Sequence, residues 1–203
     1  MIGAFDLVSV FATAGSGADG LYRSRQDDDV IAIYLNQARA LGARLILDIQ
    51  PGRAKLADEI RALREWLIAP DVDLAIDPEW NVGPRGIPGR TLGKISARQI
   101  KSVQKRLARI VADNGLPPKL LVVHQYRRGS VRGRKRIRPR PGVETVLNFD
   151  GIGPPAAKRA GYEALSVPRL FDGFSLFYRR DTPLLKPASV LALVPEPEFL
   201  LYQ

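Results

Sequence analysis

Four apolar runs in the chain each end in two polar residues that lie two positions apart. One run, Leu74–Ile76, leads into Asp77 and Glu79, with Pro78 between them and Trp80 directly after. The other three pairs are Asp48 and Gln50, His124 and Tyr126, and Asn148 and Asp150. Side chains alternate between the two faces of a β-strand, so positions two apart point the same way. We therefore expect each pair to leave the end of its strand together.

Segments rich in β-forming residues alternate along the chain with segments that have helical apolar spacing. The predicted strands are 4–13, 44–50, 72–77, 120–126, 142–149, 173–178 and 199–202, and the predicted helices are 30–41, 56–67, 96–114, 154–164 and 187–193. This alternation favours a parallel sheet covered by helices. Because 203 residues are fewer than the roughly 250 of a full barrel, we predict a compact or truncated TIM-barrel-like (β/α) fold with about seven parallel strands. An open doubly wound sheet is the alternative.

Ligands of parallel α/β folds bind at the C-terminal ends of the strands, where these polar residues are expected. Glycoside hydrolysis needs one protonated and one ionised carboxyl group, and crowding of carboxylates raises the pKa of one of them. We predict Glu79 as the general acid/base and Asp77 as its electrostatic partner. Trp80 is expected either to stack on a sugar ring or to pack within its loop. The predicted substrate-binding residues are Asp48, Gln50, Trp80, His124, Tyr126, Asn148, Asp150, Tyr178 and Tyr202.

Composition narrows the remaining function classes. The length suits one domain over residues 1–203, there is no cysteine, and no apolar run approaches the roughly 20 residues of a membrane span. No signal-peptide pattern opens the sequence, and no glycine-rich nucleotide-binding motif occurs, so no cofactor is predicted. His124, the single histidine, could join Asp48, Glu79 and Asp150 as a metal ligand in a phosphoester hydrolase, although no metal-binding spacing supports this. A carbohydrate-binding barrel without catalysis is the other alternative.

Positive charge is concentrated in one segment, residues 127–140. It contains eight basic residues and no acidic one, and without these eight the formal net charge of +10 falls to about +2. Such a segment could bind an anionic polymer through its charge. A solvated loop over the mouth of the barrel is the simpler interpretation.

Two resemblances add to these expectations. The sequence Asp77-Pro78-Glu79 is similar to the Asp-x-Glu strand end of family 18 and family 25 glycoside hydrolases, which are chitinase-like and muramidase-like barrels, but it lacks the longer chitinase run of acids. From about Tyr22 to Gln203 the chain resembles a group of secreted or lipid-anchored actinobacterial barrel proteins with no established activity. The resembling segments are Leu47–Arg53, Ile76–Trp80, Val123–Gln125, Leu176–Tyr178 and Asp181–Pro183. This resemblance implies a barrel and an extracellular or envelope location.

Overall fold

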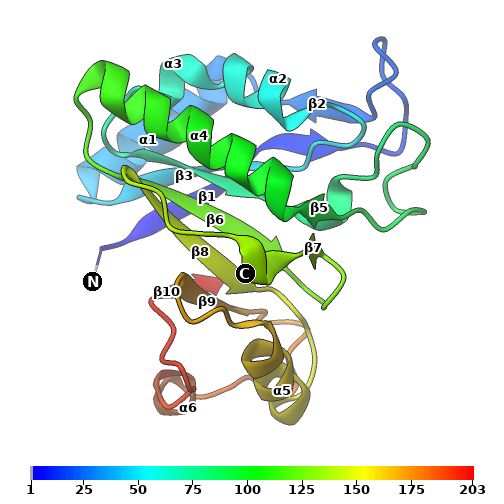
Figure 1. Ribbon diagram of the computed structural model, residues 1–203, viewed down its shortest axis with the longest axis vertical. Coiled ribbons are helices and arrows are strands. Elements are labelled where there is room, and N and C mark those ends of the chain that lie inside the picture. Colours follow the sequence, from blue (N-terminus) through cyan, green and yellow to red (C-terminus); the bar gives the residue numbers. More distant parts are fainter. Residues whose placement is uncertain (1) are drawn as a thin grey trace.

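A mostly parallel sheet of eight strands forms the centre of the protein in the computed structural model, which describes residues 2–203 (Figure 1). Seven of the strands are parallel and stand side by side in chain order. They are β1 (Ala4–Ala12), β3 (Arg44–Ile49), β4 (Val72–Ile76), β6 (Lys119–Gln125), β8 (Val143–Phe149), β9 (Phe171–Leu176) and β10 (Phe199–Tyr202). The short strand β2 (Arg23–Arg25) pairs antiparallel with β1 at one edge. The seven predicted strands are therefore confirmed.

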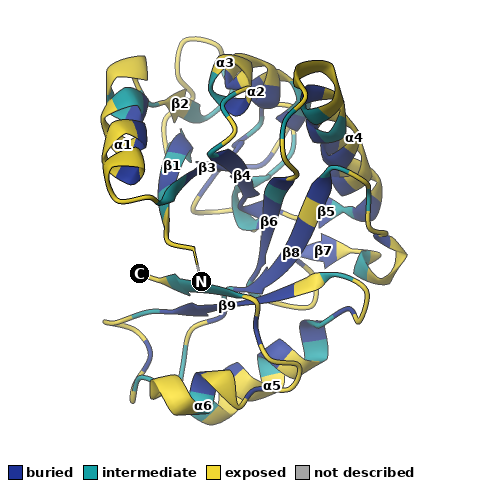
Figure 2. Cartoon of the chain, turned by 90° about the vertical axis from the view of Figure 1, so that its left-hand side faces the viewer, coloured by how far each residue is buried: buried dark blue, intermediate teal, exposed yellow. Residues whose placement is uncertain are grey.

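The sheet curls into a half-barrel with the helices on its convex side (Figure 2). The helices are α1 (Asp28–Ala40), α2 (Leu56–Ala62), α3 (Arg64–Leu67), α4 (Ala97–Asn114), α5 (Pro155–Leu165) and α6 (Pro187–Leu191). The order of the parallel strands does not reverse anywhere in the sheet, as it would in a doubly wound fold, so that alternative is wrong. The predicted helix 56–67 is in fact two helices, because the chain leaves helical geometry at Leu63.

The longest helix, α4, begins and ends as its sequence predicts. The Ser96 side chain accepts a hydrogen bond from the Gln99 N–H, and the Gln99 side chain accepts one from the Ser96 N–H, which completes a capping box. Gly115 ends the helix in the left-handed conformation, with φ of 60°. The apolar side of α4, which includes Ile100, Val103 and Leu107, packs into the main core between helices and sheet.

Most basic side chains of segment 127–140 are exposed to solvent, but the segment also contains short regular elements. Its strand β7 (Val131–Arg132) pairs with β5 (Ile95–Ser96), and the 3₁₀ turn η2 (Arg134–Arg136) follows. Val131 and Ile137 are buried in the main core. The segment thus has an apolar anchor beneath its basic side chains. Among the described helices, none is long and apolar enough to cross a membrane.

Candidate functional site

The concave face of the half-barrel consists of an apolar layer and a polar layer. Side chains of Ile46, Ala75, Val122 and Val146 form a small buried cluster of their own on neighbouring strands. A polar residue follows each of these four apolar residues two positions later in the chain. The polar residues are Asp48, Asp77, His124 and Asn148. The alternation of side chains along strands therefore gathers four of the predicted site residues at the C-terminal ends, as the sequence indicated.

His124 is the centre of the polar layer and is buried, with 4% of its surface exposed. Its Nδ1 lies 3.1 Å from the Asn148 amide nitrogen and 3.8 Å from an Asp150 oxygen. Its Nε2 lies 4.0 Å from an oxygen of Asp6 on β1. When the Asn148 amide donates, Nδ1 accepts and a neutral His124 carries its proton on Nε2. Protonation of Nδ1 requires the Asn148 amide to turn its oxygen toward the ring.

Negative charge around His124 exceeds positive charge. Burial lowers the pKa of His124, but the nearby charges of Asp150, Asp48 and Asp77 outweigh this and hold it well above 6.5. Burial raises the pKa of Asp48 well above 3.8, with Asp6 and Asp77 adding to the effect and His124 opposing it. The pKa of Asp6 is raised by burial in the same way. The cluster therefore retains protons that the same groups would release in water.

Asp77 and Glu79 lie in a turn and not on one face of a strand, which corrects the expected geometry. Strand β4 ends at Ile76, and residues Pro78–Trp80 form the 3₁₀ turn η1. The Asp77 carboxylate accepts a hydrogen bond from the Glu79 N–H at 3.3 Å and so caps this turn. Burial, with the charges of Glu79 and Asp150, raises the pKa of Asp77 to about 7. Burial and the charge of Asp150 also raise the pKa of Glu79, which is half-buried.

The loop after η1 is fastened against this turn. The Gly93 N–H donates to the Glu79 carbonyl, and the Asn81 side chain donates to the Lys94 carbonyl. A Cβ on Gly93 would lie 2.5 Å from the Pro78 carbonyl oxygen and 2.6 Å from the Asn81 backbone, so only glycine allows this approach. Gly93 therefore holds the backbone that carries Glu79.

A buried ion pair supports the other side of the site. The Lys158 ammonium of α5 lies 2.5 Å from an Asp181 oxygen and donates to the Ser175 carbonyl at 2.7 Å. Asp181 also accepts from the N–H groups of Gly153 and Phe177. These bonds join the segments that follow β8 and β9. The Ser175 hydroxyl of β9 in turn accepts from the Asn148 amide at 2.7 Å, which orients Asn148 beside His124.

The remaining predicted residues lie at the rim or apart from the cluster. Gln50 accepts a hydrogen bond from the Ala12 N–H and joins β3 to β1. Trp80 is half-buried in η1, and the ring of Tyr126 lies under the Arg127 guanidinium at 5.4 Å. Tyr178 and Tyr202 stack on each other with ring centroids 5.9 Å apart and are 63% and 45% exposed. No hydrogen bond or ion pair among residues 2–203 links these two tyrosine side chains to His124 or the carboxyl groups.

Sequence reasoning missed Asp6, Ser175 and Arg180. Asp6 interrupts an apolar strand and shares its face with Val8, which pairs with Asp48, so alternation could have found it. Ser175 lies on β9 beside β8, where Gly173 pairs with Asn148. Arg180 follows β9 and lowers the pKa of Glu79 against the larger effect of burial. Nothing in the sequence indicated that this arginine would approach Glu79.

The cluster does not resemble a preformed metal centre. Within residues 2–203, no three side chains of histidine, cysteine, aspartate or glutamate are arranged to hold one metal ion. A groove of about 420 Å³ runs between α5 and the segment after β6, and neither His124 nor the carboxyl groups of the cluster are among its lining residues. Tyr126 and Gly151 line the groove, and Gly151 directly follows Asp150. Comparisons of the chain with protein-family models, curated proteins and solved structures found no match.

Proposed function

We propose that the half-barrel is a shortened (β/α) barrel whose polar mouth hydrolyses glycosidic bonds in an extracellular or envelope polysaccharide. The observation that carries the proposal is the crowding of five carboxyl groups around one histidine at the C-terminal ends of parallel strands. The carboxyl groups belong to Asp6, Asp48, Asp77, Glu79 and Asp150. Such crowding keeps one carboxyl protonated near neutral pH, as a glycosidase acid requires.

Glu79 is the general acid in this proposal. It is half-buried on a turn at the mouth, its pKa is raised by burial, and its backbone is fixed by Asp77 and Gly93. Glu79 gives its proton to the glycosidic oxygen as the bond to the anomeric carbon breaks, and the bonding electrons stay with that oxygen. Asp77, once ionised, stabilises the positive charge on the sugar. Water then adds to the anomeric carbon and returns a proton to Glu79.

The groove between α5 and the segment after β6 offers a place for neighbouring sugars. Its floor on α5 is formed by Ala157, Ala160, Gly161 and Ala164. These small side chains leave room for a ring, and the adjoining walls carry Tyr126 and two arginines. A sugar chain lying in this groove would pass Gly151, next to Asp150.

A carbohydrate-binding protein without catalysis is the second candidate. The observation that favours it is the exposed stacked pair of Tyr178 and Tyr202, because exposed aromatic rings offer an apolar face to sugars. This pair lies at the ends of β9 and β10, the last two strands of the sheet. Binding on this platform alone would not need Glu79.

Glu79→Gln separates the two candidates. The amide cannot supply the proton but has nearly the same shape, so hydrolysis predicts loss of turnover with glycan binding retained. The test measures reducing ends released from a panel of bacterial envelope polysaccharides, together with binding of the same glycans by calorimetry. Glu163→Gln is the matched control, because Glu163 is exposed on α5. Binding without turnover in the wild type, lost in Tyr178→Ala, would establish the binding protein instead.

A further inference from the structure

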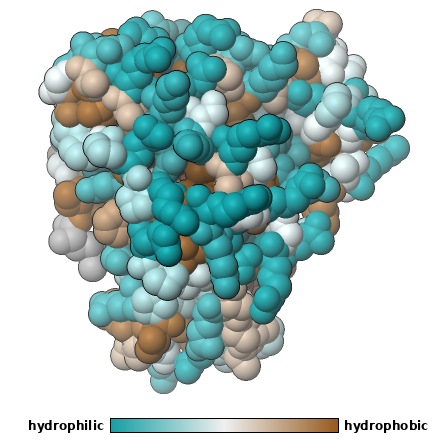
Figure 3. Space-filling model, in the orientation of Figure 1, coloured by the Kyte–Doolittle hydropathy of each residue, from teal (hydrophilic) through white to brown (hydrophobic). Residues whose placement is uncertain are grey.

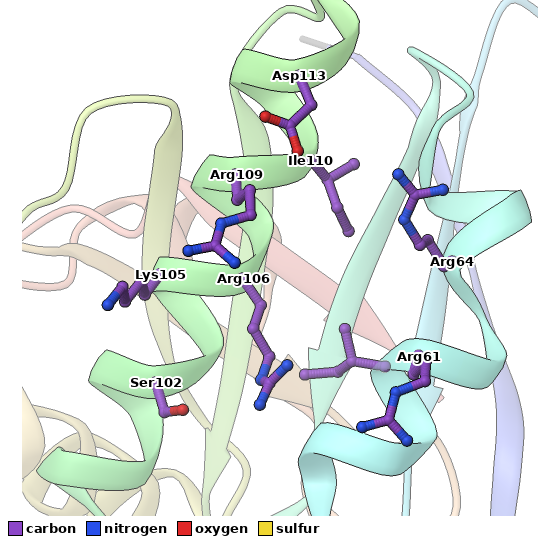
Figure 4. A pocket seen from close by; sticks show the side chains of 9 residues that line it. Arg61, Arg64, Ser102, Lys105, Arg106, Arg109, Ile110 and Asp113 are labelled. Atoms are coloured by element: carbon purple, nitrogen blue, oxygen red, sulfur yellow. The ribbon is translucent and has the colours of Figure 1, made fainter.

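A second cavity lies on the convex side of the sheet, between α2–α3 and α4, and has a volume of about 350 Å³ (Figure 4). Arg61 and Arg64 project from the α2–α3 wall, and Arg106 projects toward them from α4 (Figure 4). Lys105 and Arg109 line the α4 edge. We call these five residues and the space between them the basic groove. The sheet separates the basic groove from the carboxyl cluster on the concave side.

The positive charge of the basic groove is largely uncompensated. Within residues 2–203, Arg64, Lys105, Arg106 and Arg109 make no ion pair, and Arg61 pairs only with Asp58 at 2.9 Å. Asp113 is the only acidic residue that lines the cavity. Figure 3 shows hydrophilic side chains gathered over α4 on this face.

The charge pattern of α4 opposes its own stability. Lys105 and Arg109 lie four residues apart on the exposed side of the helix. Like charges at this spacing destabilise a helix, and Arg61 and Arg64 add positive charge across the cavity. A bound anion would remove this repulsion. If these side chains served only to stabilise α4, acidic and basic residues would be expected to alternate at this spacing.

The side chains indicate the chemical class of the anion. Arginine presents a planar set of donors that matches phosphate oxygens. Ile60 and Ile110 form an apolar floor, and no aromatic residue lines the cavity, so nothing is present on which a nucleobase could stack. The α4 wall from Ser102 to Asp113 is about 17 Å long at 1.5 Å per residue, which is enough for more than one phosphate group.

We propose that the basic groove binds a phosphodiester chain through its phosphates, with the aliphatic part of the chain over Ile60 and Ile110. The residues used here lie outside segment 127–140 and outside the carboxyl cluster. The proposal therefore does not depend on the proposed hydrolysis. This binding proposal goes beyond the proposed hydrolysis, because it gives the protein a separate site that binds sugar-phosphate or polyol-phosphate polymers.

The test measures binding of two fluorescent 12-mers at several salt concentrations. One is oligothymidylate, and the other is an abasic oligomer with the same sugar-phosphate backbone and no bases. We expect both to bind wild type with similar affinity. Arg106→Gln/Arg109→Gln should weaken both by about tenfold or more, since each charged hydrogen bond lost has a large effect. The slope of log affinity against log salt should fall by about 1.4, at about 0.7 per phosphate contact on a single strand.

Two matched variants control for net charge. Arg98→Gln/Lys101→Gln removes two charges from the same helix outside the cavity lining, and Arg132→Gln/Lys135→Gln removes two from the basic segment. Both should keep most of the affinity. Equal loss in either control, or much tighter binding of oligothymidylate than of the abasic oligomer, would overturn the proposal.

Thermal unfolding gives an independent readout. Without ligand, Arg106→Gln/Arg109→Gln should unfold at the same temperature as wild type or higher, because repulsion is relieved. Tripolyphosphate should raise the Tm of wild type and of both controls but not of this variant. A variant that loses Tm without ligand, and responds to tripolyphosphate as wild type does, would show that the arginines are structural.

Discussion

Asp77→Asn should make the protein's stability much less sensitive to pH. In the folded protein the pKa of Asp77 is raised from 3.8 to about 7, so the folded state binds more protons than the unfolded chain between these pH values. The free energy of unfolding therefore falls as pH rises through this window. At about 1.4 kcal/mol per pH unit, the full effect is about 4 kcal/mol, and the part between pH 5 and pH 8 is about 2–3 kcal/mol. The asparagine oxygen can still accept the hydrogen bond from the Glu79 N–H.

Urea unfolding of wild type and variant at pH 5 and pH 8 measures this difference. We expect Asp77→Asn to gain about 2–3 kcal/mol relative to wild type between these two values. Glu163→Gln, which removes an exposed carboxyl on α5, should run parallel to wild type. A difference between Asp77→Asn and wild type that stays constant from pH 5 to pH 8 would refute the raised pKa, and with it the crowding of the cluster.

Three further substitutions test the supports of the site and the helix beside it. Gly173→Ala would place a Cβ 2.8 Å from the Asn148 amide oxygen, so we expect a loss of about 1–3 kcal/mol in urea unfolding; an unchanged midpoint would show that Asn148 can move. Lys158→Met leaves Asp181 buried without its cation and should lower the free energy of unfolding by about 3–5 kcal/mol. The double variant Lys158→Met/Asp181→Leu should recover part of this loss. A double variant as unstable as the single one would contradict the expectation. Ser96→Ala removes the side-chain acceptor of the α4 capping box and should lower stability by about 1 kcal/mol, measured by circular dichroism during heating; no change would mean that Gln99 alone caps the helix.

Local patterns predicted the architecture well because each strand carries its own alternation. Asp48, His124 and Asn148 lie two residues beyond buried apolar residues on the same face, and this period is visible in the chain. The capping box at Ser96 and the glycine at 115 likewise depend only on neighbouring residues. These features could be predicted because short-range geometry determines them.

Contacts between distant segments could not be predicted in this way. Lys158 pairs with Asp181 only because α5 and the segment after β9 fold over the same end of the sheet, and Arg180 on that segment lies near enough to lower the pKa of Glu79. The turn at Pro78–Trp80 replaced the extended geometry expected for Asp77 and Glu79. In that turn, the Asp77 carboxylate accepts a hydrogen bond from the Glu79 N–H and so fixes the backbone of Glu79.

The charge of the chain was also misjudged from sequence alone. Counting basic residues along the sequence singled out only segment 127–140. The basic groove instead combines Arg61 and Arg64 with basic residues of α4 that are more than 40 positions away in the chain. The chain as a whole is nearly neutral outside the basic segment, yet the fold places five basic side chains around one cavity on its outer face. Only the packing of α4 beside α2 and α3 brings these residues together.

The pH dependence of reducing-end release tests the proposed hydrolysis most directly. With a polysaccharide that the wild type cleaves, release should pass through a maximum as pH is varied. It should fall on the acid side, where Asp77, whose pKa is raised to about 7, takes up a proton, and on the alkaline side, where Glu79, whose pKa is raised by burial, loses its proton. Glu79→Gln should release nothing at any pH while binding the same glycan. Release by Glu79→Gln equal to wild type across the pH range, or glycan binding by the wild type with no release from any substrate, would contradict the assignment of Glu79 as the catalytic acid.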